Sequence, residues 1–149
     1  MIYLDTSVVV ALLLPEENSE IALRWFEGCR APMISSDWLI PETHSALGIK
    51  QRVHGLPSAA CAAAAAHFER LVRTGVDLRS LDRARFRQAG ALLQRPELGL
   101  RAGDALHLAV ALHHRCSHLA TLDGRMLQAA QHLGLRPALP EPRRLAPPP

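Results

Sequence analysis

The chain has 149 residues, of which 48% are hydrophobic and 21% are charged, a balance that fits one globular domain and excludes an intrinsically disordered chain. Its net charge is only +3 and Lys50 is its single lysine, so composition alone is weak evidence for a nucleic-acid partner. No stretch approaches the roughly 20 uncharged apolar residues that span a bilayer, so we expect no membrane segment.

Short apolar segments alternate with helical segments along the chain. In chain order the sequence predicts strand 2–4, helix 8–14, helix 16–28, strand 32–35, helix 37–54, helix 59–73, strand 76–81, helix 83–94, helix 102–115, strand 118–122, helix 124–133 and edge strand 135–137. Short polar side chains mark helix starts, and we expect caps at Thr6 or Ser7, at Ser58 and at Asp82. Pro41 predicts a bend or a delayed start in its helix.

This alternation implies right-handed crossovers and a parallel sheet with helices on both faces. We therefore expect an α/β fold, a three-layer α/β/α sandwich around a short, mostly parallel central sheet of four to five strands. Residues 1–137 are expected to form this domain, and residues 138–149 a proline-rich C-terminal tail.

The cysteines and the N-terminus indicate the compartment. The three cysteines are far apart and form no CxxC pair, which is typical of reduced thiols. The apolar N-terminus contains Asp5 and has no basic leader, so it does not predict a signal peptide. We therefore expect a cytoplasmic protein.

Four acidic residues stand at corresponding places in this topology. Asp5 and Asp123 each follow a strand, whereas Glu42 and Asp104 each lie early in a helix. Strand ends and the starts of the following helices share one edge of a parallel sheet, where such folds bind ligands. Each acid taken alone is more often a cap, a turn residue or a solvated residue. Together they predict a converged carboxylate site.

Converged carboxylates repel one another, and burying them unpaired is costly or raises their pKa values. A divalent cation removes that cost, and hard oxygen ligands favour Mg²⁺ or Mn²⁺ over zinc. The hydroxyls of Thr6, Ser7 and Thr121 are expected to bind waters on the metal or to orient a carboxylate. Such a site suits phosphodiester hydrolysis, because the metal activates a water and neutralises charge on the leaving oxygen.

Four blocks of sequence carry a family resemblance. They are Leu4-Asp5-Thr6-Ser7, Pro41-Glu42 followed by Ser45-Ala46-Leu47, Arg101-Ala102-Gly103-Asp104-Ala105-Leu106-His107-Leu108-Ala109, and Thr121-Leu122-Asp123 with Leu127 and Ala130. In order and spacing they resemble the PIN-domain nucleases, and the VapC-type toxins of bacterial toxin–antitoxin pairs in particular, over roughly residues 1–137.

The resemblance implies a PIN-like sandwich and a Mg²⁺- or Mn²⁺-dependent endoribonuclease, the toxin of a VapBC-like pair, which hydrolyses RNA with a metal-activated water. It also implies a homodimer, held inactive by a VapB-like antitoxin whose tail enters the acidic groove. The family's metal-site acids map onto Asp5, Glu42 and Asp104, with Asp123 at a more variable position. Thr6 and Thr121 match its accessory hydroxyls.

Two other functions stay open at this point. A haloacid-dehalogenase-like phosphatase also places an aspartate after its first strand, but it needs a second aspartate where this chain has Ser7, and a late lysine where the only one is Lys50. A catalytically inactive module of the PIN fold would bind RNA or protein without cleaving it. The presence of all four acids favours the enzyme.

Basic and histidine residues near the acids can be explained by a functional role or by an ordinary structural one. Arg101 is the best single candidate for contacting RNA phosphates, against the alternative of a solvated helix face. His107 lies one turn beyond Asp104 on the same helix face, which leaves contact with the site open, but a packing role is favoured for it. The spacing of the histidines around Cys116 fits no familiar zinc site.

Overall fold

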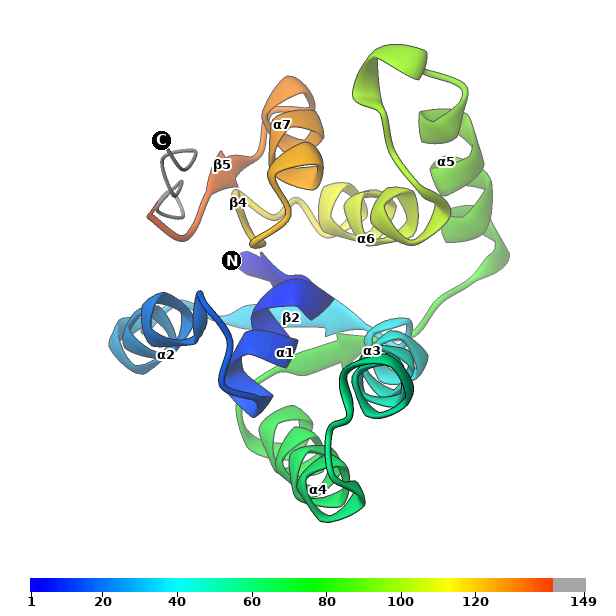
Figure 1. Cartoon of the computed structure of the whole chain (residues 1–149). Helices are drawn as coiled ribbons and strands as arrows, with labels where there is room; N and C mark the ends of the chain where they lie inside the picture. Colours follow the sequence, from blue (N-terminus) through cyan, green and yellow to red (C-terminus); the bar gives the residue numbers. More distant parts are fainter. Residues whose placement is uncertain (141–149) are drawn as a thin grey trace, which may run out of the picture.

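A five-stranded parallel sheet organises the fold (Figure 1). The computed structural model describes residues 1–140. The strands are β1 (Ile2–Leu4), β2 (Met33–Ser36), β3 (Asp77–Arg79), β4 (His118–Ala120) and β5 (Arg136–Pro137). Their order is β3-β2-β1-β4-β5 and every neighbouring pair is parallel, so β1 lies at the centre of the sheet.

Helices cover both faces of this sheet. Within the described residues they are α1 (Thr6–Leu13), α2 (Ser19–Gly28), α3 (Leu39–His54), α4 (Ser58–Thr74), α5 (Arg83–Leu93), the 3₁₀ helix η1 (Pro96–Leu98), α6 (Ala102–His113) and α7 (Gly124–His132). Helices α5, α6 and α7 pack on one face, and α1 to α4 pack on the other (Figure 1). The expected three-layer α/β/α sandwich is confirmed.

The central strand β1 contributes to both halves of the core. Successive side chains of a strand point to opposite faces of the sheet. Tyr3 therefore packs among residues of α5, α6 and α7, whereas Ile2 and Leu4 pack against α1 to α4. Because both faces are covered, β1 is an uninterrupted apolar run, as is typical of a buried parallel strand. The residue that follows it, Asp5, emerges at the carboxyl edge of the sheet.

The cap of α1 differs from the one expected. Asp5 itself holds the cap position, with an extended backbone and a carboxylate that accepts the Ser7 N–H at 3.3 Å. The expected cap at Thr6 or Ser7 was therefore wrong, because both residues already belong to the first turn of α1. One residue thus ends the central strand and begins the first helix.

Three other helix starts were predicted with mixed success. Ser58 is the first residue of α4 and Pro57 holds its cap position, so the expected Ser58 cap was wrong. Asp82 caps α5 as expected, since its carboxylate accepts the Arg85 N–H at 2.8 Å. The start of α3 is delayed to Leu39, which puts Pro41 in the first turn, where a helix lacks acceptors for its N–H groups.

The packed chain continues past β5. The Ala138 N–H donates to the Leu119 carbonyl at 2.9 Å, and Leu139 is buried among residues of α1 to α4. Residues 141–149 of the expected proline-rich tail lie outside the described residues. Within residues 1–140, no helix combines the length and the apolar character needed to cross a membrane.

Candidate active site

Asp5 stands at the carboxyl end of β1 and is 5% exposed. Its Oδ2 atom accepts hydrogen bonds from Ser7 Oγ at 2.5 Å and from Thr121 Oγ1 at 2.7 Å. Its Oδ1 atom lies on the side of His107, 3.7 Å from Nε2. The donors are therefore concentrated on one oxygen, which fixes the orientation of the carboxylate.

The two hydroxyls that hold Asp5 also join β4 to α1. Ser7 Oγ accepts the Leu122 N–H at 2.9 Å, and Thr121 Oγ1 accepts the Asp123 N–H at 3.0 Å. Each hydroxyl thus accepts a backbone N–H from the loop after β4 and donates to Asp5. Of the two roles expected for these hydroxyls, the structure shows the orientation of a carboxylate, and that carboxylate is Asp5.

Glu42 enters the same region from the first turns of α3. Its Oε2 atom accepts hydrogen bonds from Thr6 Oγ1 and from His107 Nε2, the latter at 2.7 Å. Burial raises the pKa of Glu42. The hydrogen bond and the charge of His107, together with the Thr6 hydroxyl, lower the pKa by more than burial raises it, so the net pKa lies below its ordinary value. Glu42 is therefore held as a carboxylate.

His107 contacts the acidic site, which the sequence left open but favoured less than a packing role. It lies on α6, is 1% exposed and contacts two polar side chains besides Glu42. Nδ1 is 2.8 Å from the Tyr3 hydroxyl, and Nε2 is 3.3 Å from Thr6 Oγ1. The spacing of three residues from Asp104 was the available signal, because residues three apart share a helix face. The packing role expected for His107 is corrected to a polar contact with the acidic cluster.

Asp104 and Asp123 both begin helices at this edge of the sheet. Asp104 is in the first turn of α6 and accepts the Arg101 N–H at 3.1 Å. Burial raises its pKa, the Arg101 N–H lowers it, and the charges of Asp123, Asp5 and Glu42 raise it again, with a net rise. Asp123 is exposed and caps α7, because its Oδ1 accepts the N–H groups of residues 125 and 126.

The donor atoms at this site fit a hard divalent cation. Atoms of Asp5, Glu42 and His107 lie within 4.8 Å of one another, the only such group among the described residues. Asp104 and Asp123 are outside this tight group but close enough for their charges to interact with it. Carboxylate oxygens are the preferred ligands of Mg²⁺ and Mn²⁺. Burial first, and then the charges of Asp123, Asp5 and Glu42, raise the pKa of Asp104, and a bound cation would offset both effects.

The histidines near Cys116 show no comparable arrangement. The rings of His113 and His114 meet edge to face, and His118 Nδ1 is hydrogen-bonded to Ser117 Oγ at 2.9 Å. Within residues 1–140 they do not join a group of metal-ligating atoms.

Gly103 leaves the room that Glu42 occupies. A Cβ atom at residue 103 would lie 2.7 Å from Glu42 Oε1 and 3.3 Å from Trp38 Nε1. The first distance is shorter than real Cβ atoms show, so any larger residue would displace the Glu42 carboxylate. Thr6 and His107 thus hold the Oε2 atom of Glu42, and the backbone of α6 at Gly103 restricts the space around its Oε1 atom.

Gly103→Ala is expected to leave the melting temperature unchanged or slightly higher, because alanine favours a helix by about 0.5–1 kcal/mol over glycine. It is also expected to weaken Mn²⁺ binding, measured by titration calorimetry, because Glu42 must move. Gly90→Ala on α5 is the matched control, since a Cβ there meets no atom within 4 Å. Equal Mn²⁺ affinities of the two variants would contradict this interpretation of Gly103.

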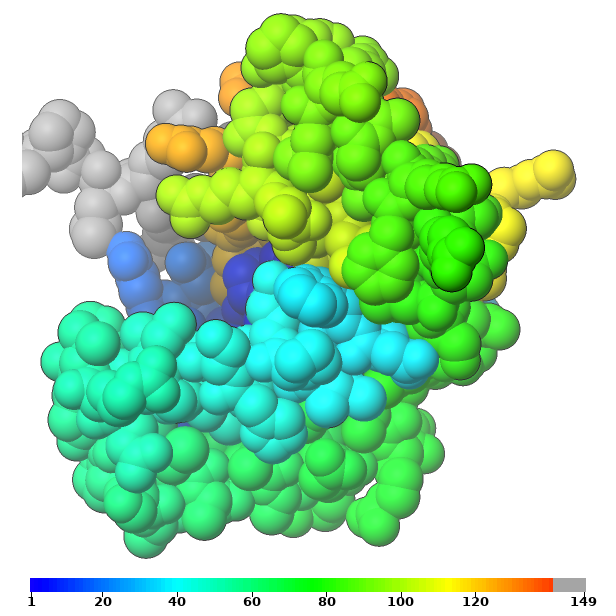
Figure 2. All heavy atoms as spheres, turned by 90° about the vertical axis from the view of Figure 1, so that its right-hand side faces the viewer, coloured from blue at the N-terminus to red at the C-terminus, as the bar shows by residue number. Residues whose placement is uncertain are grey.

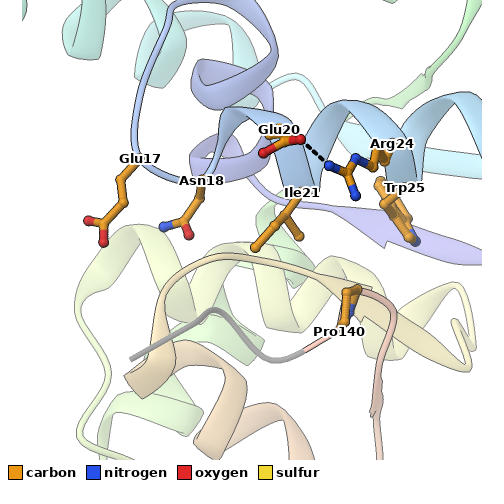
Figure 3. A pocket seen from close by; sticks show the side chains of 7 residues that line it. All are labelled: Glu17, Asn18, Glu20, Ile21, Arg24, Trp25 and Pro140. Carbon is orange, nitrogen blue, oxygen red and sulfur yellow. Dashed lines mark hydrogen bonds and ion pairs between the residues drawn. The ribbon is translucent and has the colours of Figure 1, made fainter. Parts of the chain in front are cut away.

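The surface around the acids is hollowed. A hollow of about 550 Å³ is lined by Thr6, Ser7 and Asp123, with Glu17 and Asn18 from the chain before α2. Glu17 and Asn18 also line a second hollow of about 600 Å³, into which Ile21 and Trp25 of α2 point toward Pro140 (Figure 3). Figure 2 shows the face that carries α3 and α5, which is hollowed between α3 and the chain leading into α6.

Comparisons with known proteins agree with this architecture. The chain matches the PIN domain family over residues 2–131. It resembles the crystal structure of Mycobacterium tuberculosis VapC20, a sarcin-ricin loop cleaving toxin, with a TM-score of 0.74 and 22% identity, over 94% of this chain and 100% of that chain. It also resembles FitAcB from Neisseria gonorrhoeae, with a TM-score of 0.59 and 18% identity, over 88% and 94% of the two chains.

At these identities the structural likeness shows a shared fold. A comparison with curated protein sequences found no match. The family match spans most of the chain and includes all four predicted acids. The chain therefore belongs to the PIN-domain family.

Proposed function

We propose that this chain is a Mg²⁺- or Mn²⁺-dependent endoribonuclease and the toxin of a VapBC-like toxin–antitoxin pair. The observation that carries the proposal is the close approach of Asp5 and Glu42 at one edge of the sheet, with Asp104 and Asp123 near enough for their charges to interact. Burial, and then the charges of Asp123, Asp5 and Glu42, raise the pKa of Asp104. Such an arrangement is unfavourable without a cation and suits one well. Cytoplasmic RNA is the substrate that the proposal implies.

Asp5, Glu42 and Asp104 would hold the cation, with Asp123 as a fourth acid that also caps α7. When bound, the cation would activate a water for attack on phosphorus and offset the charge on the leaving oxygen. Ser7 and Thr121 keep Asp5 oriented by donating to a single oxygen. The chain's own contribution is thus an oriented set of carboxylates, with no protein nucleophile required.

RNA is the proposed substrate class. VapC20, whose fold this chain shares, is described as a sarcin-ricin loop cleaving toxin. Single-stranded RNA loops expose their bases for recognition. Arg101 is exposed at the start of α6, beside Asp104, where its charge would attract a phosphate. Arg101 is therefore the proposed RNA contact.

A VapB-like antitoxin and a second copy of the chain are the proposed protein partners. The two adjoining hollows offer a peptide both the acidic site and the apolar side chains of Ile21 and Trp25.

Val53 on α3 and Phe86 on α5 are 69% and 51% exposed, and their helices share the face seen in Figure 2. A contiguous apolar patch favours association, so light scattering of the purified protein, which measures its oligomeric state, tests whether this face pairs two copies.

The two other functions have less support. In a haloacid-dehalogenase-like phosphatase a lysine would serve the first aspartate, but the only lysine, Lys50, is ion-paired with Glu16. The polar contacts of Asp5 come instead from Ser7, Thr121 and His107. An inactive module of the PIN fold would have no need for a set of carboxylates that repel one another.

Incubation of the purified protein with single-stranded RNA tests the proposal. Cleavage is expected with Mg²⁺ or Mn²⁺, is expected to stop with EDTA, and is expected to return when Mn²⁺ is added in excess. DNA of the same sequence is the control for substrate class. Cleavage that persists in EDTA, or RNA that stays intact in every condition, would overturn the proposal.

A further inference from the structure

A buried chain of hydrogen bonds leads from the core to the acidic site. It begins at Ser36 at the end of β2, whose Oγ accepts a hydrogen bond from the Tyr3 hydroxyl at 3.1 Å. The single hydrogen of the Tyr3 hydroxyl goes to Ser36, so in the 2.8 Å contact between Tyr3 and His107 the ring nitrogen Nδ1 is the donor. On the other side of the ring, His107 Nε2 lies 2.7 Å from Glu42 Oε2. Tyr3, Ser36 and His107 are each at most 1% exposed, so water does not compete for these contacts.

His107 meets the acids as a hydrogen-bond donor. An ionised carboxylate only accepts hydrogen bonds, so the 2.7 Å contact with Glu42 requires a hydrogen on Nε2. A ring nitrogen that carries a hydrogen has no lone pair to give to a metal ion, and Nδ1 is already bonded to Tyr3. His107 is therefore close to the proposed cation site without the atom needed to ligate it.

The contacts on both sides of the ring fix its position. Tyr3 lies on the central strand, and its ring meets that of His107 edge to face with centroids 5.6 Å apart. Glu42, by contrast, comes from α3, and a glutamate side chain has several rotatable bonds to order. The rigid elements β1 and α6 thus impose one carboxylate position on a flexible side chain.

We propose that His107, anchored by Tyr3, is a positioning residue that holds the Glu42 carboxylate in place for the cation and does not ligate the cation itself. This inference rests on the function proposed above. Donors that orient a metal's ligands typically contribute about 10- to 100-fold to metal affinity or activity. The effect of Tyr3 must pass through His107 and Glu42, since its hydroxyl contacts neither the cation site nor Glu42.

Four variants test the proposal: His107→Leu, His107→Gln, Tyr3→Phe and, as a matched control on the same helix, His113→Gln at an exposed residue. His107→Leu is expected to weaken Mn²⁺ binding, measured by calorimetry, about 10- to 100-fold. His107→Gln retains an N–H donor where Nε2 lies, so it is expected to recover most of that loss. Tyr3→Phe is expected to weaken binding by less, and to have no further effect in the Glu42→Gln background.

Crystal structures of the metal-free wild type and His107→Leu give a readout that is independent of activity. The Glu42 carboxylate is expected to keep its place in the wild type and to leave it in the variant. A wild type that binds no Mn²⁺ and cleaves no RNA would overturn the proposed function. The comparison of the Glu42 carboxylate between the two crystal structures would still test whether His107 positions it. An unmoved Glu42, or a direct Mn²⁺–imidazole coupling to His107 in electron spin resonance, would overturn the positioning role.

Discussion

Asp104→Asn is expected to raise the melting temperature of the metal-free protein at neutral pH and to lower RNA cleavage at least about 100-fold. The two effects have one cause. In the absence of a cation, burial and the charges of Asp123, Asp5 and Glu42 disfavour an ionised Asp104. Removing that charge relieves the repulsion but also removes a ligand.

The pH dependence of this stabilisation has a defined sign. The pKa of Asp104 in the folded protein is raised above its ordinary value of 3.8, so ionisation costs stability as the pH rises through the folded pKa. The advantage of Asp104→Asn is therefore expected to be absent below about pH 3.8 and to grow toward neutral pH. The asparagine oxygen can still accept the Arg101 N–H, so the start of α6 keeps this contact.

Thermal denaturation in EDTA across this pH range checks the prediction. Asp82→Asn is the control, because Asp82 also accepts a backbone N–H at a helix start but is exposed. It is expected to gain no comparable stability at neutral pH. A metal-free Asp104→Asn protein less stable than the wild type at pH 7 would contradict the repulsion inferred for the site.

Mn²⁺ is expected to raise the melting temperature of the wild type by roughly 5–10 °C at a concentration 100 times its dissociation constant, through binding to the folded state alone. Asp5→Asn is expected to abolish most of this shift, because it halves the charge of the most buried pair of acids, Asp5 and Glu42. Asp37→Asn, at an exposed residue after β2, is expected to retain it. Equal shifts in all three proteins would place the cation elsewhere.

Much of the fold, and the position of the predicted acids relative to the sheet, could be derived from local patterns. Apolar runs with turn signals on both sides located the strands, and parallel topology then predicted that Asp5 and Glu42 would lie at the same edge. Exact helix starts were less accessible, because Thr6, Ser7 and Ser58 are all good caps by residue type. Which residue holds the cap depends on where the preceding strand or turn delivers the chain.

The role of His107 depended on a contact that no local pattern encodes. A histidine on an apolar helix is ordinarily a packed residue, and its neighbours here come from β1 and from α3, 104 and 65 residues away in the sequence. The sequence spacing placed it on the face of Asp104 but carried no information on the Tyr3 hydroxyl. Only the three-dimensional arrangement joins Tyr3, His107 and Glu42.

The most direct test of the four-acid site is RNA cleavage by three proteins purified identically: the wild type, Asp5→Asn and Asp37→Asn, each with Mn²⁺ and with EDTA. Thermal melting first establishes that all three are folded. The wild type and Asp37→Asn are expected to cleave RNA only with Mn²⁺, and Asp5→Asn is expected to lose at least about 100-fold in rate. Cleavage by Asp5→Asn at the wild-type rate, or no cleavage by the folded wild type, would contradict the assignment.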